Sequence, residues 1–126
     1  MERDHVVPLS DDAIALLKAM PREIGNPYLF PSPNKERAPM SNMAMSNVLK
    51  RMKRKDGVTV HGFRSTFRTW TAEKNLDIPR EIAEAALAHI VGGVEGVYQR
   101  GTYLETRRDL MTRWATYARG ESSKDA

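Results

Sequence analysis

The chain has 126 residues, of which 40% are hydrophobic, so it can form one small domain with its own core. It contains no cysteine, which excludes internal disulfides and thiolate metal sites and gives no sign of an oxidising compartment. The amino terminus lacks the apolar core of a signal peptide, and no apolar stretch approaches the roughly 18 residues of a membrane span. We therefore expect a cytoplasmic protein. Its formal net charge of +4 favours polyanionic partners, although this charge alone is weak evidence.

A first helix is predicted after an extended segment at residues 5–9. Ser10 can cap the start of this helix, two carboxylates follow in its first turn, and Pro21 ends it. From Pro21 to Pro39, prolines, asparagines and a glycine predict a loop with little regular structure.

A second helix is predicted from Ser41, which can cap it, with one apolar stripe formed by Met45, Val48, Leu49 and Met52. It runs into a cluster of five basic residues in six: Lys50, Arg51, Lys53, Arg54 and Lys55. This cluster is either a solvated helix end, where cations suit the helix dipole, or a surface that contacts phosphates. The β-branched residues at 57–60 predict a short extended segment.

A third helix is predicted to begin near His61. Three aromatic residues share one of its faces (Phe63, Phe67 and Trp70), and three basic residues share nearly the opposite face (His61, Arg64 and Arg68). The helix is thus expected to be anchored on one side and basic on the other. We interpret Trp70 and Trp114 as core residues rather than platforms for stacked bases, because each continues an apolar helical stripe.

Two more helices complete the predicted chain. Asn75, Asp77 and Pro79 open a fourth helix, which two glycines end after His89. Thr102 and Glu105 fit a capping box at the start of the fifth and longest helix, whose apolar stripe is Leu104, Met111, Trp114 and Ala118. Gly120 ends it, and residues 120–126 are expected to be a disordered tail.

Four residues stand out as candidates for chemistry. His61 and Arg64 form a His-x-x-Arg pair at the start of a helix, His89 ends the next helix 25 positions after Arg64, and Tyr98 follows nine positions later. Any one of them taken alone would more often be structural, but the ordered set is hard to obtain by accident. Tyr103 and Tyr117 are competing nucleophiles by residue type, and we interpret both as structural.

This set resembles the carboxy-terminal motifs of tyrosine recombinases, which read His-x-x-Arg, Leu-Gly-His and a tyrosine nine residues later. The chain departs from that pattern only at Ala88, where glycine is usual. Segments from residues 5–10, 29–32, 61–67 and 98–114 further resemble integrases of prophages and genomic islands, so the resemblance spans about residues 5–118.

The resemblance implies a mainly α-helical fold, the distal part of an integrase catalytic domain, with at most a short extended segment. We expect residues 1–119 to form this part of the domain. The family's active site also needs an arginine near the start of the domain and a lysine on a β-hairpin, and both would lie upstream of residue 1. We therefore expect a fragment that does not recombine DNA alone.

The chemistry implied by the resemblance is the cutting and rejoining of DNA through a 3′-phosphotyrosyl intermediate. Tyr98 would be the nucleophile, and Arg64 would stabilise charge on the non-bridging phosphate oxygens. His61 and His89 would assist by proton transfer and by hydrogen bonding to a phosphate oxygen, and the sequence leaves open which does which. Neither a metal nor another cofactor is implied.

The partners implied are double-stranded DNA attachment sites and further integrase protomers, which form a tetramer on DNA in the intact parent. The residues expected to contact DNA are the cations Lys50, Arg51, Lys53, Arg54, Lys55, Arg68 and Arg100. An alternative is a non-catalytic helical DNA-binding module in which these cations merely contact phosphates. A third possibility is an inert helical protein without DNA affinity.

Overall fold

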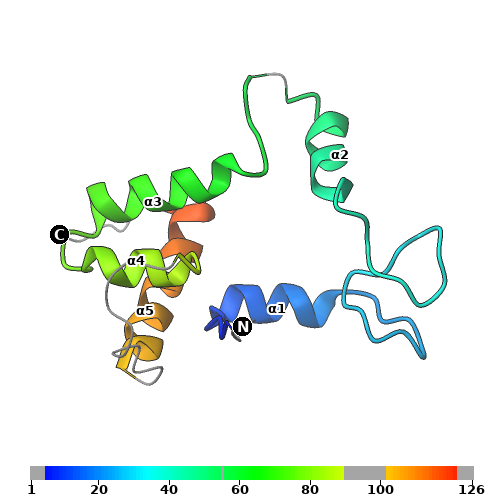
Figure 1. Ribbon diagram of the computed structural model, residues 1–126, viewed down its shortest axis with the longest axis horizontal. Helices are drawn as coiled ribbons and strands as arrows, with labels where there is room; N and C mark the ends of the chain where they lie inside the picture. The colour runs from blue at the N-terminus through cyan, green and yellow to red at the C-terminus, as the bar shows by residue number, and fades with distance from the viewer. Residues whose placement is uncertain (1–4, 55, 90–101, 122–126) are drawn as a thin grey trace.

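The computed structural model describes residues 5–54, 56–89 and 102–121. Within these residues the chain forms five helices and no strand (Figure 1), so the mainly helical fold predicted from the sequence is confirmed. Residues 57–60, predicted to be extended, do not form a β-strand. An isolated β-bridge joins Pro31 to Pro39. The helices are α1 (Asp11–Ala19), α2 (Ala44–Arg51), α3 (Gly62–Lys74), α4 (Arg80–Ala86) and α5 (Thr102–Ala118).

The core lies where α3, α4 and α5 pack together (Figure 1). Its buried residues are Phe67, Trp70, Ile82 and Leu110, with further apolar side chains around them. The ring of Trp114 lies 5.2 Å from that of Phe67, edge to face, and 5.1 Å from that of Trp70. Such aromatic contacts stabilise a core beyond the apolar area they bury. The prediction that both tryptophans belong to the core is confirmed.

Two details of the predicted core are wrong. Phe63 is predicted to share the buried face of α3 with Phe67, yet 54% of it is exposed. The buried residues of α3 begin at Phe67, and Phe63 lies one turn before that point, at the start of the helix. Leu110 is fully buried although it was absent from the predicted stripe of α5. A helix that is contacted by more than one neighbour buries a wider face than a single stripe indicates.

The amino-terminal segment is fastened to α5, far along the chain. Ser10 caps α1 as predicted, accepting a hydrogen bond from the Ala13 amide at 3.2 Å. The buried Arg107 on α5 donates to the Val6 carbonyl at 2.6 Å, and Arg119 forms an ion pair with Asp12 of α1. These contacts attach α1 to the helical core.

Helix α2 stands apart from the packed helices (Figure 1). Met45, Val48 and Met52 of its predicted apolar stripe are exposed, so this stripe is not part of the core. The predicted cap at Ser41 is also wrong, because the Ser41 carbonyl instead closes a turn with the Ala44 amide at 3.1 Å. The helix therefore begins at Ala44, without a side-chain cap.

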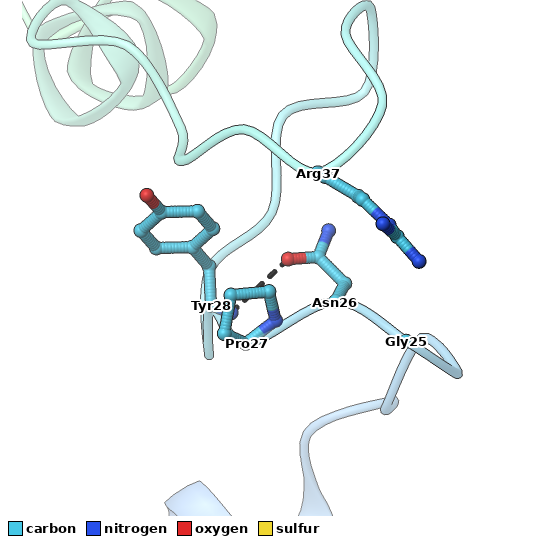
Figure 2. Close-up of a pocket in the computed structure, with 5 residues that line it drawn as sticks. All are labelled: Gly25, Asn26, Pro27, Tyr28 and Arg37. Atoms are coloured by element: carbon cyan, nitrogen blue, oxygen red, sulfur yellow. Dashed lines mark hydrogen bonds between the residues drawn. The ribbon is translucent and has the colours of Figure 1, made fainter.

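None of the helices in the described part of the chain is both long and apolar enough to cross a membrane. The loop between α1 and α2 holds a hollow of about 600 Å³, lined by Gly25, Asn26, Pro27, Tyr28 and Arg37. The Asn26 side chain accepts a hydrogen bond from the Tyr28 amide at 3.0 Å, drawn as a dashed line in Figure 2. The lining offers one cation, Arg37, and one phenol, Tyr28, but neither histidine nor carboxylate.

Candidate functional site

A second hollow, of about 280 Å³, lies between α3 and the end of α4. It is lined by His61, Arg64, Ser65, Arg68, Thr69, Glu84, Leu87 and His89. Three of the four residues singled out for chemistry in the sequence, and the DNA-contact candidate Arg68, therefore line one space. The fourth, Tyr98, lies outside the described residues, as do Lys55 and Arg100.

Arg64 connects the two helices that form the hollow. One of its terminal nitrogens, Nη2, donates to the Leu87 carbonyl at 2.6 Å and lies 2.8 Å from Nε2 of His89. His61 stands three positions before Arg64, at the amino-terminal end of α3, and is exposed to solvent within the same hollow. The site thus places a guanidinium and two imidazoles around a space open to an anion.

The position of His89 follows from the way α4 ends. The His89 amide donates to the Glu84 carbonyl at 2.9 Å, and the Ala88 amide donates to the Ala85 carbonyl at 3.1 Å. This pair of bonds is a Schellman motif, in which the residue after the helix cap takes a left-handed conformation. Ala88 occupies that place with φ of +58°. The geometry accounts for the glycine that is usual here in the family the sequence resembles, since glycine adopts this conformation without strain.

Replacing Ala88 with glycine is expected to raise the free energy of unfolding by about 0.5–1 kcal/mol, as the relief of left-handed strain exceeds the entropy that glycine adds to the unfolded chain. Ala88 is exposed, so little packing is lost. Urea unfolding followed by circular dichroism measures the change. The matched control is Ala72→Gly at an exposed, right-handed position inside α3, which should lower stability by about 1 kcal/mol. A loss of stability in Ala88→Gly would contradict this account.

Glu84 is a residue of this site that the sequence analysis missed. One carboxylate oxygen, Oε2, lies 2.6 Å from Nδ1 of His89, and the other, Oε1, accepts from Nε of Arg68 at 2.7 Å. Only 13% of its side chain is exposed. The hydrogen bond with His89, and then that with Arg68, hold the pKa of Glu84 below its usual value. The only signal in the sequence is a carboxylate five positions before a histidine at a helix end.

The described cations of the basic cluster lie at the end of α2 or just after it and do not line this hollow, since α2 stands apart from α3 and α4 (Figure 1). Lys50, Arg51 and Lys53 are exposed. Arg54 pairs with Asp56, and its Nε lies 3.1 Å from both carboxylate oxygens, so part of its charge is neutralised locally. Contact of this cluster with DNA stays a prediction.

The two competing tyrosines both contact apolar or aromatic side chains, although 47% of Tyr117 is exposed. Tyr103 packs against the core, and the ring of Tyr117 stacks on that of Trp114 with centroids 5.5 Å apart. Both positions agree with the structural interpretation of these residues. Among the residues that the structure describes, no group of three histidine, aspartate or glutamate side chains is arranged to hold a metal ion.

Comparison with known proteins shows that the chain is similar to phage and prophage integrases over 90% or more of its length, so the resemblance to such integrases predicted from the sequence is confirmed. Prophage integrase IntA of Escherichia coli (strain K12) is 39% identical over 125 residues, which cover 98% of this chain and 30% of that protein. Prophage integrase IntZ of the same strain is 38% identical over 114 residues, covering 90% of this chain and 28% of the relative.

The integrase of Shigella phage Sf6 is 35% identical over 117 residues, covering 90% of this chain and 30% of that integrase. The chain therefore spans less than a third of the length of these relatives. No family model and no solved structure gives a significant match.

Proposed function

We propose that residues 1–119 form part of the catalytic domain of a tyrosine-type site-specific recombinase, which cuts and rejoins DNA through a 3′-phosphotyrosyl intermediate at Tyr98. The observation that carries this proposal is the meeting of Arg64 and His89, 25 positions apart in the chain, with His61 on the same hollow. Relatives named as integrases support DNA as the substrate. Because the chain spans a fraction of those relatives, the activity is proposed for a polypeptide of their length.

In the proposed reaction a DNA phosphate occupies the hollow between α3 and α4. The phenol oxygen of Tyr98 bonds to phosphorus and loses its proton, while the bond to the 5′ oxygen breaks and that oxygen gains a proton. Arg64 holds the non-bridging oxygens as their negative charge grows, because a guanidinium offers two donors in a fixed plane. His61 is assigned to proton transfer and His89 to donation to a phosphate oxygen. Rejoining reverses these steps, so the bond energy is conserved without a cofactor.

The proposed partners are a double-stranded attachment site and further protomers that assemble as a tetramer. The exposed cations at and just after the end of α2 would contact the DNA backbone. The same exposed cations favour a second candidate, a non-catalytic DNA-binding module. The two candidates differ in one product, the covalent link between protein and DNA.

A chimera tests the proposal. Residues 5–119 replace the aligned segment of the prophage integrase IntA, and the chimera is incubated with a nicked duplex that carries the attachment site of that integrase and traps a cleaved strand. A protein–DNA adduct that survives denaturing electrophoresis, linked to the 3′ end of the DNA, is expected. The 126-residue chain alone should give no adduct, because the resemblance assigns two further catalytic groups to sequence upstream. A chimera that binds the duplex and never forms an adduct would contradict strand cleavage, and salt-dependent binding of a duplex by the 126-residue chain itself would then support the binding module.

A further inference from the structure

We propose that Glu84 is a positioning residue of this site, whose carboxylate fixes the tautomer of His89 and so presents the Nε2 atom of that histidine to Arg64 and to a bound phosphate oxygen. The inference rests on the proposed function for the identity of the anion. Its structural part, the selection of one tautomer, stands on the geometry of α3 and α4 alone.

Glu84 holds His89 at two points. Its backbone carbonyl accepts the His89 amide at 2.9 Å, which places the residue after the end of α4. Its side-chain oxygen Oε2 lies 2.6 Å from Nδ1 of the ring, which sets the orientation of the imidazole. The left-handed turn at Ala88 allows both contacts, because it folds the chain back over the last turn of the helix.

The carboxylate is itself held in place. Arg68, on α3, donates a hydrogen bond to Oε1 of Glu84 at 2.7 Å. Arg80, on the same helix as Glu84, has its Nε 3.7 Å from that oxygen. The hydrogen bond with His89 and then that with Arg68 favour the ionised form of this side chain, which is largely shielded from solvent. Glu84 therefore has one oxygen fixed by arginine and one directed at His89.

An ionised carboxylate can only accept hydrogen bonds, so the 2.6 Å contact requires a hydrogen on Nδ1 of His89. In a neutral ring the other nitrogen, Nε2, then carries a lone pair. This is the arrangement that Nη2 of Arg64 needs at 2.8 Å, since a guanidinium can only donate. The opposite tautomer would place two donors against each other at Nε2 and leave Nδ1 and the carboxylate as two facing acceptors.

The same arrangement suits the anion that the proposed function requires. A phosphate oxygen that replaces Nε2 as the acceptor for Arg64 leaves Nε2 free to take up a proton and donate to the phosphate. Nδ1 keeps its hydrogen on Glu84 in both states, so the ring need not turn over. Among the residues that the structure describes, the other charged or titratable groups lining this space are His61, Arg64 and Arg68 from the side of α3 and Glu84 from α4, with Arg80 paired to Glu84. Of these, only Glu84 offers negative charge to a protonated His89.

Nitrogen-15 NMR of the 126-residue chain tests the inference. Long-range correlations between ring protons and ring nitrogens distinguish the two tautomers of a neutral histidine, and they are recorded well above pH 6.5, where an ordinary imidazole is uncharged. Substitution of His5 and His61 in turn assigns the signals of His89. In the unchanged chain, His89 is expected to carry its hydrogen on Nδ1. A predominance of the Nε2–H form would overturn the inference without any variant of Glu84.

The decisive variant is Glu84→Gln, which keeps the shape of the side chain but can both donate and accept. The ratio of the Nδ1–H to the Nε2–H form of His89 is expected to fall about tenfold, since a charge-assisted hydrogen bond is lost. The matched control is Glu81→Gln, an exposed carboxylate on the same helix that should leave the ratio unchanged. An unchanged ratio in a folded Glu84→Gln chain would overturn the inference, and a variant that fails to fold leaves the decision to the unchanged chain.

The outcome is separable from that of the proposed function. Adduct formation by the chimera with no tautomer shift in Glu84→Gln would refute the role of Glu84 and leave the recombinase in place. A tautomer shift with no adduct would support the role of Glu84 in holding His89 and refute the strand-cleavage chemistry.

Discussion

Replacing Tyr98 with phenylalanine is expected to abolish the covalent protein–DNA adduct in the IntA chimera while leaving DNA binding close to unchanged. The substitution removes one oxygen atom, which is the atom that bonds to phosphorus in the proposed reaction, and keeps the aromatic ring. Without it the strand is bound but not cut. Trapping on the nicked duplex measures the adduct, and a mobility-shift titration at fixed salt concentration measures binding, because affinity for DNA depends steeply on salt.

The control variants for this experiment are Tyr103→Phe and Tyr117→Phe. Tyr103 packs against the core and Tyr117 stacks on Trp114, so neither phenol is assigned to the reaction. Both variants are expected to form the adduct at a rate close to that of the unchanged chimera. An adduct that survives Tyr98→Phe and disappears in Tyr103→Phe would transfer the nucleophile to Tyr103 and contradict the spacing argument.

Replacing Arg64 with lysine is expected to reduce the rate of strand cleavage by about 10²–10³-fold. Lysine keeps the positive charge but offers a point charge on a flexible stem, whereas a guanidinium presents several donors in one plane. In the structure one guanidinium nitrogen, Nη2, makes both contacts across the hollow, with the Leu87 carbonyl and with Nε2 of His89, and the contacts within the described residues leave Nε and Nη1 for a phosphate. Single-turnover cleavage by the chimera at saturating DNA measures the effect.

The control for Arg64 is Arg22→Lys, an exposed cation in the loop between α1 and α2 that does not line the hollow. This variant should cleave at an unchanged rate, because its contribution is at most to binding. A rate loss below tenfold in Arg64→Lys would show that charge alone suffices at this position, and it would remove the bidentate role from the proposed mechanism.

Much of the local structure could be predicted from the sequence, because helix formation depends on residues within one or two turns of one another. The serine cap and the acidic first turn of α1 were predicted correctly. The same reasoning placed His61 and Arg64 on one side of α3, since residues three apart in a helix are neighbours. It went wrong at Ser41, where a serine that can cap a helix belongs instead to the preceding turn. Residue type alone does not distinguish these two uses.

The site itself was decided by the packing of α4 against α3 and by the turn that ends α4. Arg64 meets the Leu87 carbonyl across 23 positions and Arg68 meets Glu84 across 16, and no local pattern indicates which cation pairs with which acceptor. The role of Glu84 depends on a left-handed residue, Ala88, which sequence reasoning noted only as a departure from a family pattern. The relative positions of side chains within one helix turn follow from helix geometry and can be read from the sequence. Which side chains meet between two helices depends instead on the angle and register at which the apolar faces of those helices pack.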